Sequence, residues 1–283
     1  MTPDYLLIGH MTADLIPSGR VLGGTVSYAA RTASAFGLKV GIVTSVAPGE
    51  PLLDELAPYA DEIVCVPGSA TSTFENLYTS SGSRQQYLRE VAAPLRYEHI
   101  PEGWRDVPLV HFGTLTGEID LANILPPFAG STTLLTAQGL LRQWGDDKLV
   151  RFKRWYDEAA LRELDWLVLS EEDIVLAPEL EARYAAAANH FVLTRAEKGG
   201  THYDHGVSST YDTPQVTVTQ PTGAGDVFAA GLLCGLHVLD GNIEAALHVA
   251  AALGATAVTR DGWKGAPTAD EVRAVLATVK AGE

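Results

Sequence analysis

Short apolar runs alternate with segments of helical periodicity along almost the whole chain. The runs have the length of buried strands and are bounded by turn residues. A predicted helix, Ser27–Phe36, lies between the first two runs, and Gly37 is suited to be its C-cap. Strands that alternate with helices predict an α/β fold, with a mostly parallel central sheet flanked by helices. The expected strands are Tyr5–Gly9, Gly41–Val46, Glu62–Val66, Leu109–Gly113, Thr133–Thr136, Trp166–Leu169 and Phe191–Thr194.

One stretch departs from this pattern. Residues 72–79 and 84–90 alternate with period two, and the polar segment Ser80–Ser83 between them is suited to a turn. The pattern predicts a β-hairpin inside an α/β chain. From the residues alone, a surface decoration and a cover over a ligand site are equally supported. A second ribbon is expected at Gly200–Asp204 and Ser209–Asp212.

The most informative chemical pattern lies between an expected strand, Gln215–Thr219, and a helix of small residues that starts at Val227. The turn Pro221–Asp226 reads Pro-Thr-Gly-Ala-Gly-Asp, and its small residues leave backbone N–H groups uncovered in front of the helix. Those amides and the positive end of the helix dipole predict an anion site. Asp226 is suited to take a proton from a hydroxyl that attacks a phosphate. The alternative is a plain turn with a capping aspartate.

Composition narrows the class of protein. The 283 residues are 46% hydrophobic, which suits one large domain over residues 1–283. A net charge of −15, with no run of Lys or Arg longer than two, makes nucleic acid and anionic membranes poor partners. Cys65 and Cys234 lack metal-like spacing, which favours a reduced, cytoplasmic setting. The apolar run Tyr5–Ile8 is too short for a signal peptide or a membrane span.

The order of strand, Thr222–Asp226 and small-residue helix resembles the C-terminal signature of the PfkB carbohydrate kinase family, the ribokinase-like sugar and nucleoside kinases. The segment Leu22–Ala30, followed by Phe36 and Gly37, is similar to the N-terminal signature of that family. The resemblance covers nearly the whole chain and is strongest at both ends. It implies a ribokinase-like fold whose small β-sheet lid comes from about residues 10–22 and 72–90. It also implies ATP and Mg²⁺ as cofactors.

The same resemblance implies that Asp14, Gly23 and Gly24 bind the acceptor. A carboxylate that accepts two O–H groups is a sound anchor for a polyol, and glycines let the polyol approach the backbone closely. Tyr28 stands where ribokinase-type members have asparagine, which speaks against a furanose sugar held by that asparagine.

Gln138 and Arg142 follow an expected core strand and therefore lie on the ligand edge of the predicted sheet. Their Gln-Gly-x-x-Arg pattern is similar to the branch that includes myo-inositol kinases. Contact of Gln138 or Arg142 with the substrate and pairing of Arg142 with nearby acids are equally supported.

On the donor side, the resemblance implies that Asp226 is the catalytic base and that Gly223, Ala224 and Gly225 line the anion hole. Asp173 is the expected contact to Mg²⁺, through water, because Mg²⁺ keeps most of its own water ligands. Gln220 replaces an aspartate that helps to hold a monovalent cation in ribokinase-type members, so potassium activation is not expected. The residues implied to bind ATP are Ser170, Thr194, Gly199, Thr222, Gly223, Gly225 and Ala251.

These features predict ATP-dependent phosphorylation of a hydroxyl on a small polyol or sugar, with an inositol as the first candidate. A nucleoside or another sugar, such as a ketodeoxygluconate type, remains open, and so does a sugar-binding pseudokinase. Ser170, where relatives have Asn, and Gln220 favour the pseudokinase, whereas intact Asp226 and both glycines of its turn argue against it. Pairing of two copies through the lid also stays open. His202 and His205, without a third ligand, are expected to be solvated.

Overall fold

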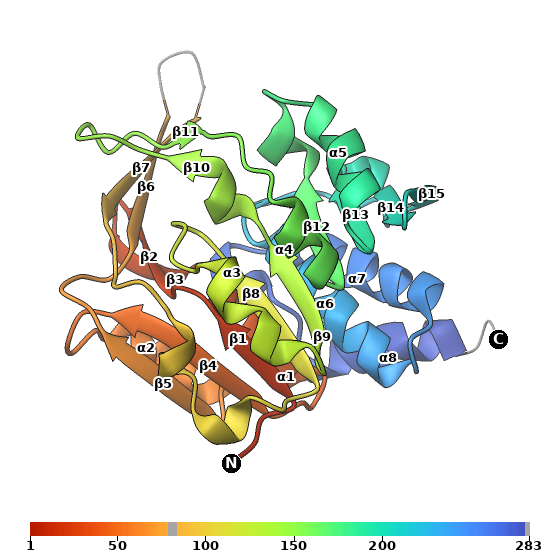
Figure 1. Cartoon of the computed structure of the whole chain (residues 1–283), viewed down its shortest axis with the longest axis horizontal. Coiled ribbons are helices and arrows are strands. Elements are labelled where there is room, and N and C mark those ends of the chain that lie inside the picture. Colours follow the sequence, from red (N-terminus) through yellow and green to blue (C-terminus); the bar gives the residue numbers. More distant parts are fainter. Residues whose placement is uncertain (79–83, 281–283) are drawn as a thin grey trace.

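A computed structural model of the chain describes residues 1–78 and 84–280. Its centre is a nine-stranded sheet in which seven neighbouring strands are parallel and two edge strands, β14 and β15, are antiparallel (Figure 1). All seven strands expected from the apolar runs are confirmed, and so is the ribbon at the edge. The order across the sheet is β15 (Val207–Tyr211), β14 (Gly200–Asp204), β13 (His190–Thr194), β12 (Trp166–Ser170), β9 (Thr132–Thr136), β8 (Leu109–Gly113), β1 (Tyr5–Ile8), β4 (Val40–Val46) and β5 (Glu62–Pro67).

Helices cover both faces of this sheet (Figure 1). One face carries α1 (Thr25–Ala35), α2 (Leu52–Leu56), α6 (Ala224–Val238) and α7 (Ile243–Ala257), with α8 (Ala269–Lys280) packed behind α7. The other face carries α3 (Leu121–Ile124), α4 (Glu158–Glu163) and α5 (Glu179–Ala187). Short 3-10 turns are η1 (Ala57–Tyr59), η2 (Tyr97–His99), η3 (Glu102–Trp104), η4 (Pro126–Phe128), η5 (Gln138–Leu141), η6 (Glu171–Ile174), η7 (Ala196–Lys198) and η8 (Gly262–Gly265).

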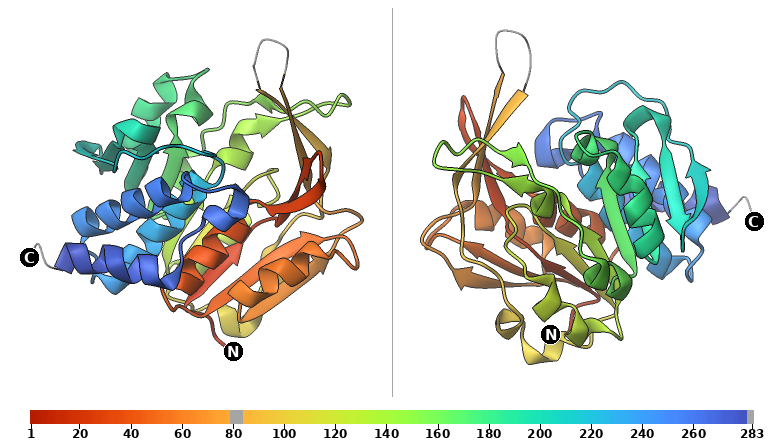
Figure 2. Two further views of the ribbon diagram at one scale, coloured as in Figure 1. Left: turned by 180° about the vertical axis from the view of Figure 1, so that it is seen from behind. Right: turned by 45° about the horizontal axis from the view of Figure 1, so that its top comes forward.

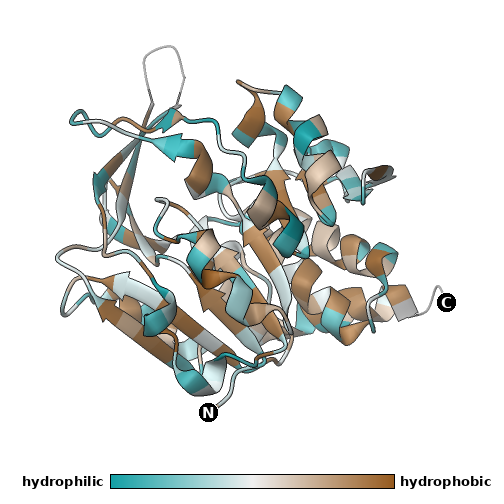
Figure 3. Ribbon diagram, viewed as in Figure 1, coloured by the Kyte–Doolittle hydropathy of each residue, from teal (hydrophilic) through white to brown (hydrophobic). Residues whose placement is uncertain are grey.

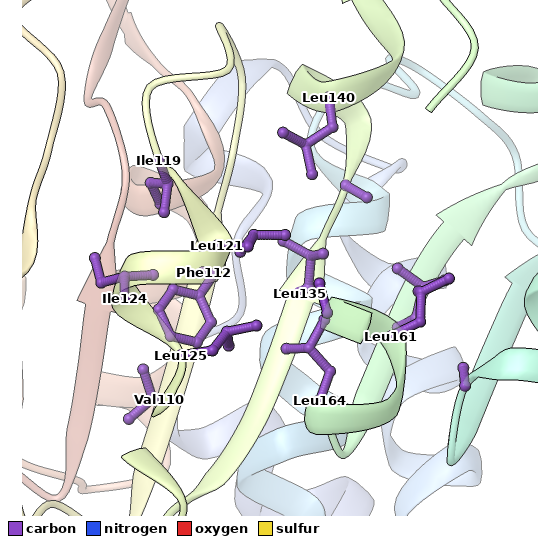
Figure 4. Packing of buried hydrophobic residues seen from close by; sticks show 14 of the residues in the cluster. Val110, Phe112, Ile119, Leu121, Ile124, Leu125, Leu135, Leu140, Leu161 and Leu164 are labelled. Atoms are coloured by element: carbon purple, nitrogen blue, oxygen red, sulfur yellow. The ribbon is translucent and has the colours of Figure 1, made fainter. Parts of the chain in front are cut away.

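The core lies between the sheet and these helices. Phe112 of β8 and Leu135 of β9 pack with Leu121 of α3 and Leu161 of α4 on one side of the sheet (Figure 4). Successive strand residues face opposite layers, so Leu134 packs on the other side with α6. Burial of each such side chain stabilises the fold by about 1.5–3 kcal/mol. Apolar residues accordingly concentrate on the strands and the inner helix faces (Figure 3).

A separate four-stranded sheet stands beside the main one (Figure 2). It contains β3 (Gly19–Gly23), β2 (Thr12–Ile16), β6 (Thr73–Tyr78) and β7 (Arg84–Glu90) in that order, and β2 pairs with β6 in parallel. Both chain segments expected to form a lid therefore contribute to this small sheet, called the lid below. The two-stranded ribbon β10 (Arg142–Gln143) and β11 (Arg151–Phe152) is linked to β7 by a Tyr87–Leu149 bridge. The turn expected at Ser80–Ser83 lies outside the described residues.

The strand expected at Gln215–Thr219 is wrong. This segment is irregular and exposed, with Val216 at 41% and Val218 at 56% exposure. The backbone N–H of Thr219 donates to the carbonyl of Val258, and so does that of Gln220 just beyond the segment. This single tertiary acceptor takes the place of the ladder that the alternating sequence suggested.

In the described part of the chain, no helix combines the length and the apolar character that crossing a bilayer requires.

Candidate active site

The carboxyl ends of the parallel strands bring together the segments that the sequence singled out. Residues 9–14 follow β1, η5 follows β9, η6 follows β12, and Arg195 follows β13. Because these strands are parallel, their carboxyl ends meet at one edge of the sheet. The N-terminus of α6 and the lid border the same region, where charges on Asp14, Arg142 and Asp173 all act on Asp226. This edge is the candidate active site.

The turn before α6 has the backbone shape that an anion site needs. Gly223 caps the helix with φ 87°, and a Cβ at this position would lie 2.1 Å from the Tyr28 ring. Only glycine fits there, because both the positive φ and the aromatic contact exclude a side chain. A Cβ on Gly225 would instead meet open space. The backbone at Gly225 is therefore open to a ligand, next to the first-turn amides of α6. The amide of Ala224 closes the turn by donating to Pro221 O at 3.3 Å.

Asp226 lies in the first turn of α6, as expected. Its Oδ1 accepts a hydrogen bond of 2.6 Å from the hydroxyl of Thr25, at the start of α1. Burial raises the pKa of Asp226 to about 6, and the nearby carboxylates of Asp173 and Asp14 add to the rise. The Thr25 hydroxyl and the Arg142 guanidinium act in the opposite direction. A carboxylate with a pKa near 6 is suited to general-base catalysis at neutral pH.

Asp14 lies on β2 of the lid and shares the site with Asp226. A Cβ on Gly23 would come within 2.5 Å of Asp14 Oδ2, so the bare backbone of Gly23 makes room for this carboxylate. Gly24 has φ 88° and caps α1, where a Cβ would crowd His10 O at 3.0 Å. Burial raises the pKa of Tyr28 well above its usual range, and the charges of Asp226 and Asp14 raise it further. Asp14 and Tyr28 therefore belong to the same site as Asp226.

Gln138 and Asp173 meet across the ends of β9 and β12. Gln138 Nε2 donates to Asp173 Oδ1 at 3.0 Å, and the Ser170 backbone N–H donates to Asp173 Oδ2 at 3.0 Å. Ser170 Oγ also accepts from Glu172 N at 3.3 Å, which completes a capping box for η6. This capping box explains why serine and aspartate occur three residues apart.

Arg142 lies over the ring of Phe74, with Cζ 5.5 Å from the ring centroid. It also borders a groove of about 250 Å³ that includes Gln86 of the lid, Gln138 and Asp173. Apolar side chains of Leu141, Val150 and Phe152 line the same groove. The lid, η5 and η6 therefore border an open groove that can hold a small molecule.

The remaining residues expected to bind ATP are more dispersed. Thr194 ends β13 and donates to Leu169 O at 3.4 Å, and Thr222 is exposed beside Gly223. Gly199 has φ 78° and packs against Tyr211, where a Cβ would lie 2.0 Å from a carbonyl oxygen. Ala251 is 3% exposed in the core of α7, and its carbonyl accepts from Thr213 Oγ1 at 3.4 Å.

One residue of the site was not singled out from the sequence. Thr25 contacts Asp226 across 201 positions. The only sequence signal for Thr25 is a hydroxyl directly after the glycine pair, which is also typical of an ordinary helix start.

The expectation that His202 is solvated is wrong. Its side chain is 4% exposed and stacks on Trp166, with ring centroids 5.4 Å apart, while His205 is exposed. His202 Nε2 lies 3.2 Å from His190 Nδ1. Within the described residues, no group of three or more His, Cys, Asp or Glu side chains is arranged to hold a metal ion.

Comparison with known proteins agrees with this geometry. Residues 155–269 match the model of the pfkB family of carbohydrate kinases. A cytidine kinase of Thermococcus kodakarensis is 28% identical over 82% of this chain and 88% of its own length. An ATP-dependent ribose-1-phosphate kinase of Halopiger xanaduensis is 36% identical over 38% of each chain. A pyrophosphate-dependent kinase of the ribokinase family, solved with a pyrophosphate analog and myo-inositol, has a TM-score of 0.78 and 21% identity, covering 95% of this chain and 99% of its own.

The fold is ribokinase-like, with a mostly parallel sheet and a separate small sheet beside it. The chain is similar to the pfkB family of carbohydrate kinases, whose model matches residues 155–269. Its class is that of the ATP-dependent carbohydrate kinases.

Proposed function

We propose that the protein transfers the terminal phosphoryl group of ATP to a hydroxyl of a small polyol or sugar, with Asp226 as the general base. The observation that carries this proposal is the position of Asp226, in the first turn of α6 and directly beside the open space at Gly225. A hydroxyl held there can pass its proton to Asp226 while the first-turn amides of α6 stabilise charge on the phosphoryl oxygens.

The acceptor would lie between the lid and α6. Asp14 would accept hydrogen bonds from two hydroxyls, and Gly23 and Gly24 would let the polyol approach the backbone. Arg142 and Gln138 would contact it from the side of η5. We favour a cyclitol such as an inositol, because Asp14 suits vicinal hydroxyls and Tyr28 takes the place of the amide expected for ribose.

The residues present also fit a polyphosphate and Mg²⁺. The open space at Gly225 leaves the backbone at the start of α6 accessible to a phosphate group. Asp173 keeps its carboxylate fixed by Gln138 and Ser170, which suits a contact to Mg²⁺ through water. Bound Mg²⁺ would neutralise charge on the phosphates of ATP. Thr194, Gly199, Thr222 and Ala251 stay proposed contacts on the nucleotide side. Pairing of two copies through the lid and a cytoplasmic setting also belong to this proposal.

The test is ADP release from Mg-ATP with a panel of cyclitols, sugars and nucleosides, with pyrophosphate as an alternative donor. We expect phosphorylation of at least one polyol or sugar by wild-type protein and its loss in Asp226→Asn. A protein that binds acceptors but releases no ADP with any of them would instead be a pseudokinase.

A nucleoside is the second candidate acceptor, and the groove beside Arg142 favours it. Amides of Gln86 and Gln138 and the apolar side chains of Leu141 and Val150 line the groove, a mixture that suits the edge and the faces of a base. The similarity to the cytidine kinase of Thermococcus kodakarensis supports the same candidate. Gln86→Ala separates the two: it should raise KM for cytidine several-fold and leave KM for inositol unchanged.

A further inference from the structure

The points where the chain enters and leaves the lid converge on one buried histidine that the proposed chemistry does not use. His10 lies between β1 and β2 and is fully buried. Its Nε2 is 2.8 Å from the carbonyl oxygen of Ala93, just after β7. Its Nδ1 is 2.8 Å from Ser72 Oγ, just before β6. One imidazole ring therefore joins three of the crossings between the main sheet and the lid.

The hydrogen bonds around this ring are mutually consistent. The carbonyl of Ala93 can only accept, so Nε2 carries the proton and donates to it. Nδ1 then accepts from the hydroxyl of Ser72, and Ser72 Oγ accepts from the amide of Ala92 at 3.0 Å. A buried polar network that is satisfied in this way holds its members in one arrangement.

The main chain of His10 is fixed as well. Glu118, which is 5% exposed, accepts from the amides of His10 at 3.0 Å and of Thr116 at 2.8 Å. Thr116 Oγ1 lies 3.2 Å from His10 Nδ1 and donates to Glu118 at 3.2 Å. The loop after β8 therefore holds the backbone of His10 against the main sheet.

The pairing of the lid strands starts at this point. Beside the His10–Ser72 contact, the amide of Ala13 donates to Ser72 O at 2.9 Å. The next residues along, Asp14 and Phe74, are direct partners in the β2–β6 ladder. A shift of β6 against β2 would therefore move Phe74, and Arg142 above it, relative to Asp14.

We propose that His10 is a positioning residue, which fixes the register of the lid on the main sheet and thereby places Asp14 for acceptor binding. The inference rests on the proposed function in one respect, the role of Asp14 as acceptor anchor.

Three variants separate the contacts of the ring. His10→Gln can keep the donor to Ala93, His10→Asn can keep the acceptor for Ser72, and His10→Leu keeps neither. We expect His10→Leu to raise the acceptor KM by about tenfold, and the two amide variants to raise it less, because each retains one hydrogen bond. KM for ATP should change by less than about twofold, because the α6 turn is not touched. The ratio of ATP hydrolysis to acceptor phosphorylation should rise with the acceptor KM.

His111→Leu is the matched control. His111 is also fully buried and also uses both ring nitrogens, with Tyr5 OH at 2.8 Å and Thr136 Oγ1 at 3.3 Å, but it lies in β8 of the main sheet. It should lower stability and leave the ratio of acceptor KM to ATP KM unchanged. An unchanged acceptor KM in folded His10→Leu, or an equal change in His111→Leu, would overturn the proposal.

Amide hydrogen exchange decides the question independently of catalysis. Exchange in residues 73–77 and 85–90 should be faster in His10→Leu than in wild type, and unchanged in His111→Leu. Equal exchange in His10→Leu and wild type would overturn the positioning role. If wild-type protein phosphorylates none of the acceptors tested, the proposed function fails, while the exchange measurement still tests His10.

Discussion

Replacing Asp226 with asparagine should abolish most activity and, at the same time, stabilise the protein at neutral pH. Burial in the folded structure raises the pKa of this carboxyl group to about 6, and the negative charges of Asp173 and Asp14 add to the rise. Asparagine has the same shape, and its Oδ1 can still accept the hydrogen bond from Thr25. The substitution therefore removes the charge and leaves the contact in place.

The magnitude follows from the pKa of the folded protein. Because this pKa lies above the ordinary value of 3.8, the folded state binds the proton more tightly than the unfolded state. Ionisation of Asp226 therefore lowers the free energy of unfolding as the pH rises from about 4 to 6. A shift of about two pKa units corresponds to at most about 3 kcal/mol, and the partial solvent contact of the side chain reduces this to about 1–2 kcal/mol. The variant should melt about 2–8 °C higher at pH 7.

Urea unfolding at pH 7 and pH 4, together with steady-state kinetics, tests both effects. The gain in stability should disappear at pH 4, where Asp226 of the wild type is protonated in the folded state. kcat of the variant should fall by about 10²–10⁴, and kcat/KM of the wild type should decline as the pH falls below about 6. An equal gain in the free energy of unfolding at both pH values would refute the electrostatic cost of ionised Asp226. Near-normal kcat in the variant would refute the role of Asp226 as general base.

Four other substitutions test further features of the structure. Gly225→Ala should weaken ATP binding with little loss of stability, whereas Gly223→Ala should also lower the melting temperature, because its Cβ would strike Tyr28; equal melting temperatures would contradict this. Asp14→Ala should raise the acceptor KM about tenfold and leave KM for ATP unchanged, since charge-assisted hydrogen bonds contribute about 1.5–3 kcal/mol each; equal rises in both KM values would contradict the assignment. Burial lowers the pKa of His202 to about 4, so the folded state loses about 2 kcal/mol between pH 7 and pH 5. In His202→Gln that loss, measured by urea midpoints, should be smaller, and an unchanged loss would exclude His202 as its source.

The sequence predicted the central sheet well because its inner strands β1, β4, β8, β9 and β12 are buried on both faces, which makes them continuous apolar runs. The turn before α6 was also predictable, because its two special features, the positive φ at Gly223 and the open space at Gly225, occur at glycines that are visible in the sequence. The segment Gln215–Thr219 has the alternation of a strand but is held by tertiary contacts to α7. Period-two alternation reports which side chains share a face and says nothing about whether a partner strand is present.

Contacts between residues far apart in the sequence account for the features that the sequence did not predict. His202 is buried because Trp166 and His190 from two other strands stack against it, and neither contact leaves a signal near residue 202. The bond from Thr25 to Asp226 likewise joins the starts of two helices 201 positions apart. These pairs depend on how α1, α6 and the strands pack, so local propensity cannot predict them.

The charges of the site make its two halves depend on each other. Asp14, Asp173 and Asp226 all act on one region, with Arg142 among them, and the mutual repulsion of the carboxylates contributes to the high pKa of Asp226. The same negative field opposes the entry of a polyphosphate, which the first-turn amides of α6 offset only in part. A divalent cation carried with the phosphates would reverse the local field and favour the ionised form of Asp226. Asp226 would then be most fully ionised, and therefore able to accept a proton, when the phosphates are in place, so hydroxyl deprotonation would be coupled to the presence of a phosphoryl group to attack.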